Sequence, residues 1–326
     1  MNKSLKIFIN YFFGPVLFII LIWSLYGQIS NQPDLRQRWA QINIGFTNWK
    51  FWLAMVMMFI NWGIESKKWQ ILINHLQHFS FWLAIKSVLC GCSITMLTPN
   101  RIGEYGGRIL HVEEKNRIKA ISLSLVGSIS QLLVTMIMGC IGLLYLRYLS
   151  LNKNGALGVL PEFWGDLLIY VSICLTIIIL LFYLRLGWLV RMMERLPTLQ
   201  KVVKHIKVLD EFNNNKLVQI LSLSFIRYLV FVMQYVLILQ AMQIETSIWL
   251  SFWLMTAFYL VMAVAPTIGF IELPLRVSAS WIIFKFYTTN ELGVGTASLA
   301  IWFVNLVIPA IIGSLLILSI KILKEK

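Results

Sequence analysis

The chain has 326 residues, of which 59% are hydrophobic and 13% are charged, and its mean hydropathy is +0.77. Soluble domains carry roughly 25% charged residues, so this composition excludes a water-soluble fold. The net charge of +14 would suit a nucleic-acid partner, but the cytoplasmic edges of membrane proteins also accumulate Lys and Arg. Since no nucleic-acid motif accompanies the charge, we expect a membrane protein with no nucleic-acid partner.

Apolar runs recur along the whole chain, and each is long enough to cross roughly 30 Å of hydrocarbon as a helix. The first run is longer than the apolar core of a secretory signal, so we expect an uncleaved helix. The polar stretches between the runs are too short for a soluble catalytic domain, which predicts a single membrane domain over residues 1–326. The predicted full spans are 7–29, 49–64, 120–149, 164–184, 216–242 and 297–323.

Two further apolar stretches, 81–97 and 248–265, end in polar motifs that contain Pro and Gly. Each motif is followed by a shorter helical stretch, so we expect helices that are broken inside the membrane. In the first, Tyr105, Gly106 and Gly107 are predicted to let helices approach closely. The residues expected at the two breaks are Pro99, Asn100, Gly103, Pro266 and Gly269.

The positive charges favour one path through the membrane. The segment 185–216 holds seven Lys and Arg residues and is predicted to be cytoplasmic, as are Lys67, Lys68 and both termini. A full crossing by 81–97 would put the seven charges outside, whereas a hairpin that returns to the cytoplasmic side keeps them inside. We therefore predict an all-α polytopic fold of about six transmembrane helices and two re-entrant hairpins. The alternative is eight transmembrane helices.

The order of spans and hairpins repeats, which predicts two halves, 1–150 and 151–326. Three crossings in each half invert the second half relative to the first. The motifs keep the same spacing: Glu104 and Glu272 are 168 residues apart, as are Arg108 and Arg276. Inverted repeats with interrupted helices are the architecture of many secondary transporters, whose substrate sites lie at the interruptions.

The segment from Pro99 to Glu104, with Arg108, and the segment from Pro266 to Glu272 resemble the paired signature of the lysylphosphatidylglycerol synthase transmembrane-region family, also called flippase-like proteins. The resemblance covers essentially the whole chain. It implies a membrane domain, alone or fused to a soluble transferase, that moves lipid between leaflets of a bacterial inner (cytoplasmic) membrane. Two departures concern the substrate: Gly269 stands alone where relatives carry more glycine, and relatives place charged residues at positions held here by Ser128, Ser130 and Gln131.

Charged residues inside the membrane are costly, so they are candidates for a site by default. Glu104 and Arg108, like Glu272 and Arg276, are four residues apart and can pair on one helix face. Together with Arg101 they are the predicted substrate-binding residues, lining a cleft for the head group of an anionic phospholipid or a polyprenyl phosphate. Alternatively, each pair only clamps a broken helix.

Other polar residues in the spans are interpreted as structural. Arg227 is expected to extend its charged end toward the interface, and four amides are expected to form interhelical hydrogen bonds. These amides are Asn61, Gln131, Gln234 and Asn305.

The leading functional hypothesis is a lipid translocator. The alternatives are a membrane-embedded transferase, with Glu104 or Glu272 as general base, and an accessory scaffold for a lipid-modifying synthase. The expected partners are a membrane phospholipid or lipid-linked substrate, anionic head groups at the basic segment 185–216, and a separate lipid-modifying enzyme or a second copy of the chain. The cysteine and histidine spacings fit no metal motif, so we expect no metal, cofactor or catalytic residue.

Overall fold

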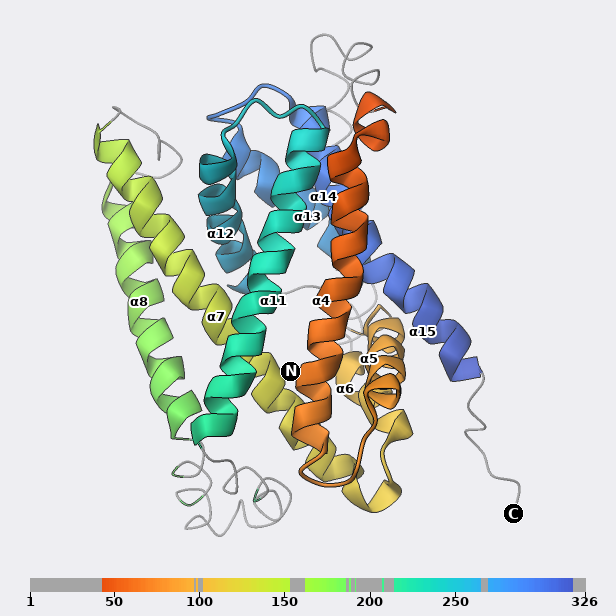
Figure 1. The fold of residues 1–326 in the computed structure, drawn as a ribbon. Helices are drawn as coiled ribbons and strands as arrows, with labels where there is room; N and C mark the ends of the chain where they lie inside the picture. The colour runs from red at the N-terminus through yellow and green to blue at the C-terminus, as the bar shows by residue number, and fades with distance from the viewer. Residues whose placement is uncertain are drawn as a thin grey trace, which may run out of the picture.

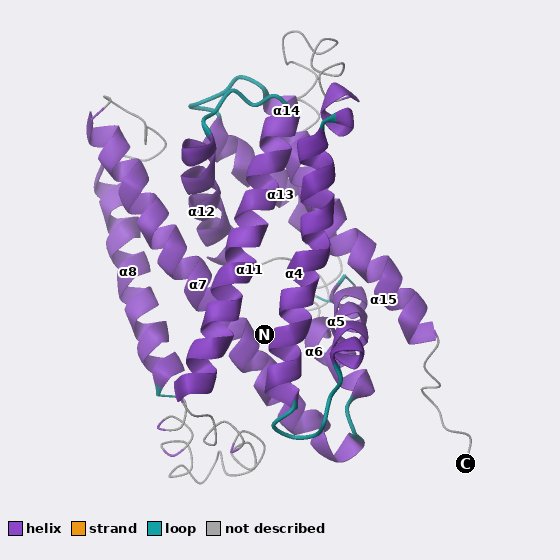
Figure 2. Cartoon of the chain, viewed as in Figure 1, coloured by secondary structure: helices purple, strands orange, loops and turns teal. Residues whose placement is uncertain are grey.

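The computed structural model describes residues 43–96, 98, 102–152, 162–185, 188, 191, 207, 214–264 and 269–318. Within these residues the regular structure is entirely helical, with no strand (Figure 2). The prediction of an all-α polytopic membrane protein is confirmed. The predicted first span, 7–29, and most of the basic segment 185–216 lie outside the described residues.

The long helices follow the predicted spans. They are α4 (Trp49–Ile73), α7 (Arg117–Asn152), α8 (Glu162–Leu184) and α11 (Asn214–Ala241). The last crossing begins six residues before the predicted start and has three parts: α14 (Glu291–Trp302), a π-helical turn η6 (Phe303–Val307) and α15 (Ile308–Leu318). By length and composition, four described helices can cross a membrane: Glu114–Leu149, Gly165–Leu184, Asn214–Ala241 and Glu291–Ile317.

The prediction that the second span ends at Ile64 is wrong, because α4 continues to Ile73. The hydropathy falls at Glu65 and Lys68, yet both side chains are buried, at 4% and 1% exposed, and they form a salt bridge of 2.9 Å. Lys68 therefore lies inside the helix bundle and does not belong with the charges of a cytoplasmic edge. Opposite charges three residues apart on one helix face can neutralise each other, which allows the helix to carry both into the interior.

Each motif separates two shorter helices. The first separates α5 (Phe81–Thr95) from α6 (Gly103–Arg108), and the second separates α12 (Ile248–Val264) from α13 (Gly269–Phe284). In Figure 1, α5 and α6 occupy the lower half of the bundle and α12 and α13 the upper half. Two short 3₁₀ turns, η2 (Ile109–His111) and η3 (Glu114–Asn116), connect α6 to α7.

The helices end and begin where the two breaks were expected, with Gly103 and Gly269 as the first residues of α6 and α13. Pro99, Asn100, Arg101 and Pro266 lie outside the described residues. The re-entrant path of the two hairpins, the alternative of eight spans and the inverted repeat of 1–150 and 151–326 stay predictions.

Close backbone contact holds the first hairpin together. A Cβ atom added to Gly91 of α5 would lie 3.0 Å from the carbonyl oxygen of Glu104, and one added to Gly107 would overlap the backbone of Cys90. The predicted close approach is therefore confirmed at Gly107. At Gly106 it is wrong, because the space beside Gly106 is open. Packing of α15 along α5, α11 along α4 and α12 along α7 completes the bundle.

The outer surface of the bundle is apolar. Large hydrophobic side chains such as Phe59, Tyr170 and Val171 are more than half exposed, which in a soluble protein would form an aggregation-prone patch. In a bilayer these side chains face lipid tails. The buried side chains form two apolar clusters, one centred on α11, α12 and α14 and the other on α4, α5 and α7. Polar groups of the interior gather at a cavity that is lined by helices of both clusters.

Candidate functional site

A cavity of about 630 Å³ lies among α4, α5, α6, α7, α11, α12 and α13. Three of the predicted binding residues, Glu104, Glu272 and Arg276, line it together. Arg108 contacts Glu104 but is not itself among the residues that line the cavity. Arg101 lies outside the described residues. The two motifs, far apart in the sequence, therefore contribute acidic and basic side chains to one hollow. Sequence reasoning did not assign three further charged residues to this site: Glu65, Lys68 and Arg227.

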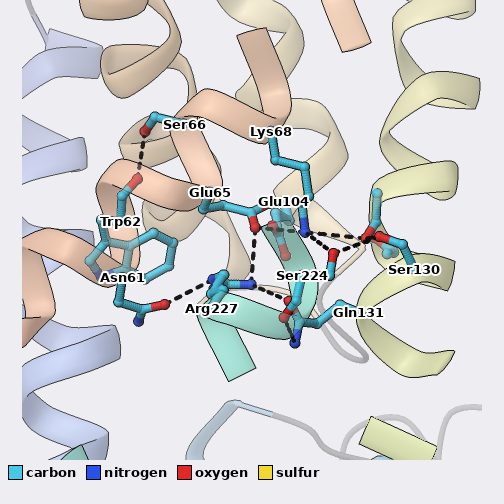
Figure 3. Close-up of polar contacts among 12 residues, drawn as sticks. Asn61, Trp62, Glu65, Ser66, Lys68, Glu104, Ser130, Gln131, Ser224 and Arg227 are labelled. Carbon is cyan, nitrogen blue, oxygen red and sulfur yellow. Dashed lines mark hydrogen bonds and ion pairs between the residues drawn. The ribbon is translucent and has the colours of Figure 1, made fainter. Parts of the chain in front are cut away.

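Glu65 is the centre of the charged network at one wall of the cavity (Figure 3). Its carboxylate contacts Lys68 Nζ at 2.9 Å, Arg108 Nη2 at 2.6 Å and Arg227 Nη1 at 3.0 Å. These cations come from α4, α6 and α11, so one buried carboxylate connects three helices. The sequence feature that could have indicated this site is a Glu at the end of an apolar run with a Lys three residues later.

Arg108 occupies the junction between Glu65 and the first motif. Its guanidinium also pairs with Glu104, as the spacing of four residues predicted, and it lies over the ring of Trp69 at 5.6 Å. The hydroxyl of Ser87 donates a hydrogen bond to the backbone oxygen of Arg108, which fixes α6 against α5. Glu104 is the more accessible of the two carboxylates, with 25% of its side chain exposed compared with 4% for Glu65.

Arg227 does not extend toward the interface, so that interpretation is wrong. Besides Glu65, its guanidinium donates to Asn61 Oδ1 at 2.9 Å and to Gln131 Oε1 at 3.3 Å. It also lies over the ring of Trp62 at 5.4 Å. A partner carboxylate and two amide oxygens replace the water that the charge would otherwise seek, which is why the side chain turns inward.

The amides in the spans form interhelical hydrogen bonds, as predicted. Asn61 Nδ2 donates to Asn305 Oδ1 at 2.9 Å, linking α4 to the π-helical turn η6. Gln234 Nε2 donates to the carbonyl oxygen of Ala54 at 2.9 Å, and Gln131 Nε2 donates to that of Ser224 at 3.5 Å. Single π-helical turns are frequently found at functional sites, and this one ends beside the cavity.

The second motif forms the predicted pair on α13. Glu272 Oε1 accepts from Arg276 Nε at 2.9 Å and contacts Arg276 Nη2 at 2.8 Å. The helix carries Pro274 between the two residues, and the pair stays on one face. Both side chains are largely buried but reach the cavity. Glu272 occupies the position in the second motif that Glu104 occupies in the first.

Neutral polar groups complete the lining. The hydroxyl of Tyr105 donates to Ser128 Oγ at 3.3 Å, at a position where relatives were expected to carry charge. Tyr228 is only 3% exposed, and its hydroxyl has no hydrogen-bond partner among the described residues. A buried hydroxyl without a partner is costly, and Tyr228 is one of the residues that line the cavity.

Positive charge exceeds negative charge in this network as far as the structure describes it. Three cations, Lys68, Arg108 and Arg227, face two carboxylates, Glu65 and Glu104. In a low-dielectric interior an unbalanced cation favours an anionic guest. Among the described residues, no group of three His, Cys, Asp or Glu side chains could hold a metal ion.

Residues 11–271 match the family model described as the lysylphosphatidylglycerol synthase TM region. The chain belongs to this family. The match spans the whole first motif and all of the second except Glu272, and it confirms the resemblance drawn from those motifs. No curated protein and no solved structure matches the chain. The family is a transmembrane region, and membership indicates an integral membrane protein involved in lipid metabolism or translocation.

Proposed function

We propose that this protein translocates a lipid across the membrane and that the cavity holds the anionic head group during the crossing. The single observation that carries the proposal is the meeting of the two motifs in one hollow. Glu104 from α6 and Glu272 and Arg276 from α13 line the same cavity, together with Lys68 and Arg227. A polar passage within an apolar bundle lowers the cost of moving a charged head group through hydrocarbon, while acyl chains stay in lipid.

The phosphate of the head group would take the place of a carboxylate that already pairs with an arginine of the site. Arg108 is shared between Glu65 and Glu104, and the more exposed Glu104 is the one that a phosphate can replace. Arginine is well suited to this exchange because its planar donors bind carboxylate and phosphate alike in a bidentate manner. Glu65 would meanwhile keep Lys68 and Arg227 in place.

Leaflet exchange in proteoliposomes tests the proposal. The probe is phosphatidylethanolamine labelled with a fluorophore on its head-group nitrogen, which leaves one negative charge on the phosphate, and dithionite bleaches the outer leaflet. We expect Arg108→Ala and Arg276→Ala to slow exchange by about 10- to 100-fold, because a hydrogen bond to a charged group contributes about 1.5–3 kcal/mol. Arg117→Ala is the matched control, since Arg117 is partly exposed and pairs at 3.9 Å with the exposed Glu114 outside the cavity.

Equal exchange by the wild type and both cavity variants would remove these arginines from the mechanism. A folded wild type that exchanges no labelled lipid would contradict translocation and favour an accessory scaffold. Unlabelled polyprenyl phosphate, added as a competitor, would slow exchange of the labelled phospholipid only if the cavity accepts both head groups.

A further inference from the structure

Helices α7 and α11 cross beside the cavity and form one of its walls. On the cavity side, α7 contributes Gln131 and α11 contributes Arg227 and Tyr228. At the crossing, the hydroxyl oxygens of Ser130 and Ser224 lie 2.8 Å apart, and Gln131 Nε2 donates to the backbone oxygen of Ser224 at 3.5 Å (Figure 3). Ser130, Gln131 and Ser224 are referred to below as the α7–α11 seam.

A second hollow, an apolar groove of about 440 Å³, borders the same two helices. Val134 and Met138 of α7 form its buried floor, and Phe225 and Ile226 of α11 form its rim, at 41% and 48% exposed. Because Phe225 and Ile226 directly precede Arg227, they project from other faces of α11 than Arg227 does. The groove therefore opens to the apolar outer surface, and the cavity lies on the inner side.

The seam carries no ion pair of its own, and hydrogen bonds contribute little to helix association in membranes. Besides the Ser130–Ser224 contact, Gln131 Oε1 accepts a hydrogen bond from Arg227 at 3.3 Å. Directly behind it lies a positive charge: Lys68 Nζ donates to Ser224 Oγ and to the carbonyl oxygen of Gly127, each at 3.3 Å. A head group that parted the seam would meet Lys68 first, since Lys68 Nζ contacts Ser224 and also lines the cavity.

From this juxtaposition we propose that the α7–α11 seam is the lateral entrance of the cavity and that the apolar groove binds an acyl chain of the entering phospholipid. The inference rests on the proposed function and adds the route. The head group passes between Ser130 and Ser224 toward Lys68, while the tail lies along Val134 and Met138. Every membrane-facing groove contacts lipid tails, and this one differs in that it borders the same two helices, α7 and α11, as a cavity lined by Lys68, Arg227 and Arg276.

A reversible disulfide across the seam tests the entrance. Ser130→Cys/Ser224→Cys would be made in a background in which the four native cysteines, Cys90, Cys92, Cys140 and Cys174, are Ala. A disulfide needs Cβ atoms about 3.5–4.5 Å apart, and hydroxyl oxygens at 2.8 Å indicate suitable side-chain directions. The matched control is Ser93→Cys/Ser314→Cys, whose hydroxyl oxygens are 2.6 Å apart and join α5 to α15, two helices that already pack together.

The readout is exchange of head-group-labelled phosphatidylethanolamine in proteoliposomes, before and after oxidation and again after reduction. We expect oxidation of the seam pair to reduce exchange to the rate of protein-free liposomes, reduction to restore it, and the control pair to exchange in both states. Persistent exchange with the seam disulfide formed, or equal loss in the control pair, would overturn the lateral entrance. Absence of exchange in the reduced pairs and the wild type alike would instead contradict translocation itself.

Filling the groove provides an independent measurement. Ser222 lies in the groove, and its hydroxyl is already bonded to its own helix backbone, so Ser222→Trp adds bulk without removing an interhelical contact. We expect this variant to exchange lipid several-fold more slowly than Val171→Trp, which places the same bulk on the lipid-facing surface of α8. Equal rates would contradict a role for the groove.

Discussion

The two motifs are alike in sequence but differ in how the structure supports them. In the first, α6 has six residues, and Arg108 is shared between Glu104 and a second carboxylate, Glu65, from another helix. In the second, α13 has sixteen residues, and Arg276 pairs with Glu272 four residues earlier on the same helix. The first motif is therefore tied into a network that spans three helices, whereas the Glu272–Arg276 ion pair of the second lies within one helix.

This difference shows where ion pairs connect separate helices of the site. The network around Glu65 fixes α4, α6 and α11 to one another, because a buried carboxylate with three cationic contacts is costly to disrupt. The following substitutions would sharpen or break the comparison between this network and the ion pair on α13.

The largest effect is expected from Glu65→Gln. It would leave Lys68, Arg108 and Arg227 with too little negative charge in the interior, and breaking a buried ion pair costs about 3–5 kcal/mol. The thermal midpoint in detergent should fall strongly. Glu114→Gln, on an exposed residue, is the control and should change the midpoint little. An unchanged midpoint in Glu65→Gln would show that this carboxylate is not the centre of the network.

A smaller loss is expected at the second motif. Glu272→Gln removes the carboxylate beside Arg276, and we expect it to cost about 2–3 kcal/mol, less than the roughly 3–5 kcal/mol for a fully buried pair, because Arg276 reaches the cavity. Glu104→Gln should cost only about 1 kcal/mol, since Arg108 keeps Glu65. Chemical denaturation of both variants, compared at equal detergent concentration, measures the order. The reverse order would contradict the distinction between network and local pair.

Neighbouring glycines in the first motif test how tightly its hairpin packs. Gly107→Ala would drive a methyl group into the backbone of Cys90 and should cost about 1–3 kcal/mol, as overpacking does. Gly106→Ala meets open space and should be neutral, or stabilising by up to about 1 kcal/mol through helix propensity. The difference between the two midpoints is the measurement. A destabilisation of the same size in both variants would argue against backbone contact between α5 and α6.

The smallest effect is expected at the amide bridge to η6. Asn305→Ala should cost about 0.6–1.7 kcal/mol, from the mean to the maximum found for hydrogen bonds between membrane helices, and Asn61→Ala should cost more, because Arg227 also loses an acceptor. Because the two residues contact each other, the double variant should cost less than the two single variants added together. Full additivity in this double-mutant cycle would show that the bridge does not couple α4 to the last helix.

The sequence predicted the local pairs of the site and a cleft shared by its two motifs, and it missed the long-range contacts of Glu65, Lys68 and Arg227. The pairs Glu104–Arg108 and Glu272–Arg276 follow from a spacing of four residues on a helix, and both form. Glu65 and Arg108 are 43 residues apart, and Asn61 and Arg227 are 166 apart, so no local pattern brings them together. Arg227 was misread for this reason, since its partners lie on α4 and α7.

Hydropathy and the placement of Pro and Gly by themselves determined the membrane class, most of the helix bounds and the two interruptions, because each depends on the transfer cost and backbone preference of nearby residues. Only the tertiary structure decided that α4 carries its charges to Ile73 and that Glu65, Lys68 and Arg227 join both motifs at one cavity. The physical reason is that a charge enters the membrane interior only when partners from other helices compensate for its lost water. Those partners are set by how the helices pack.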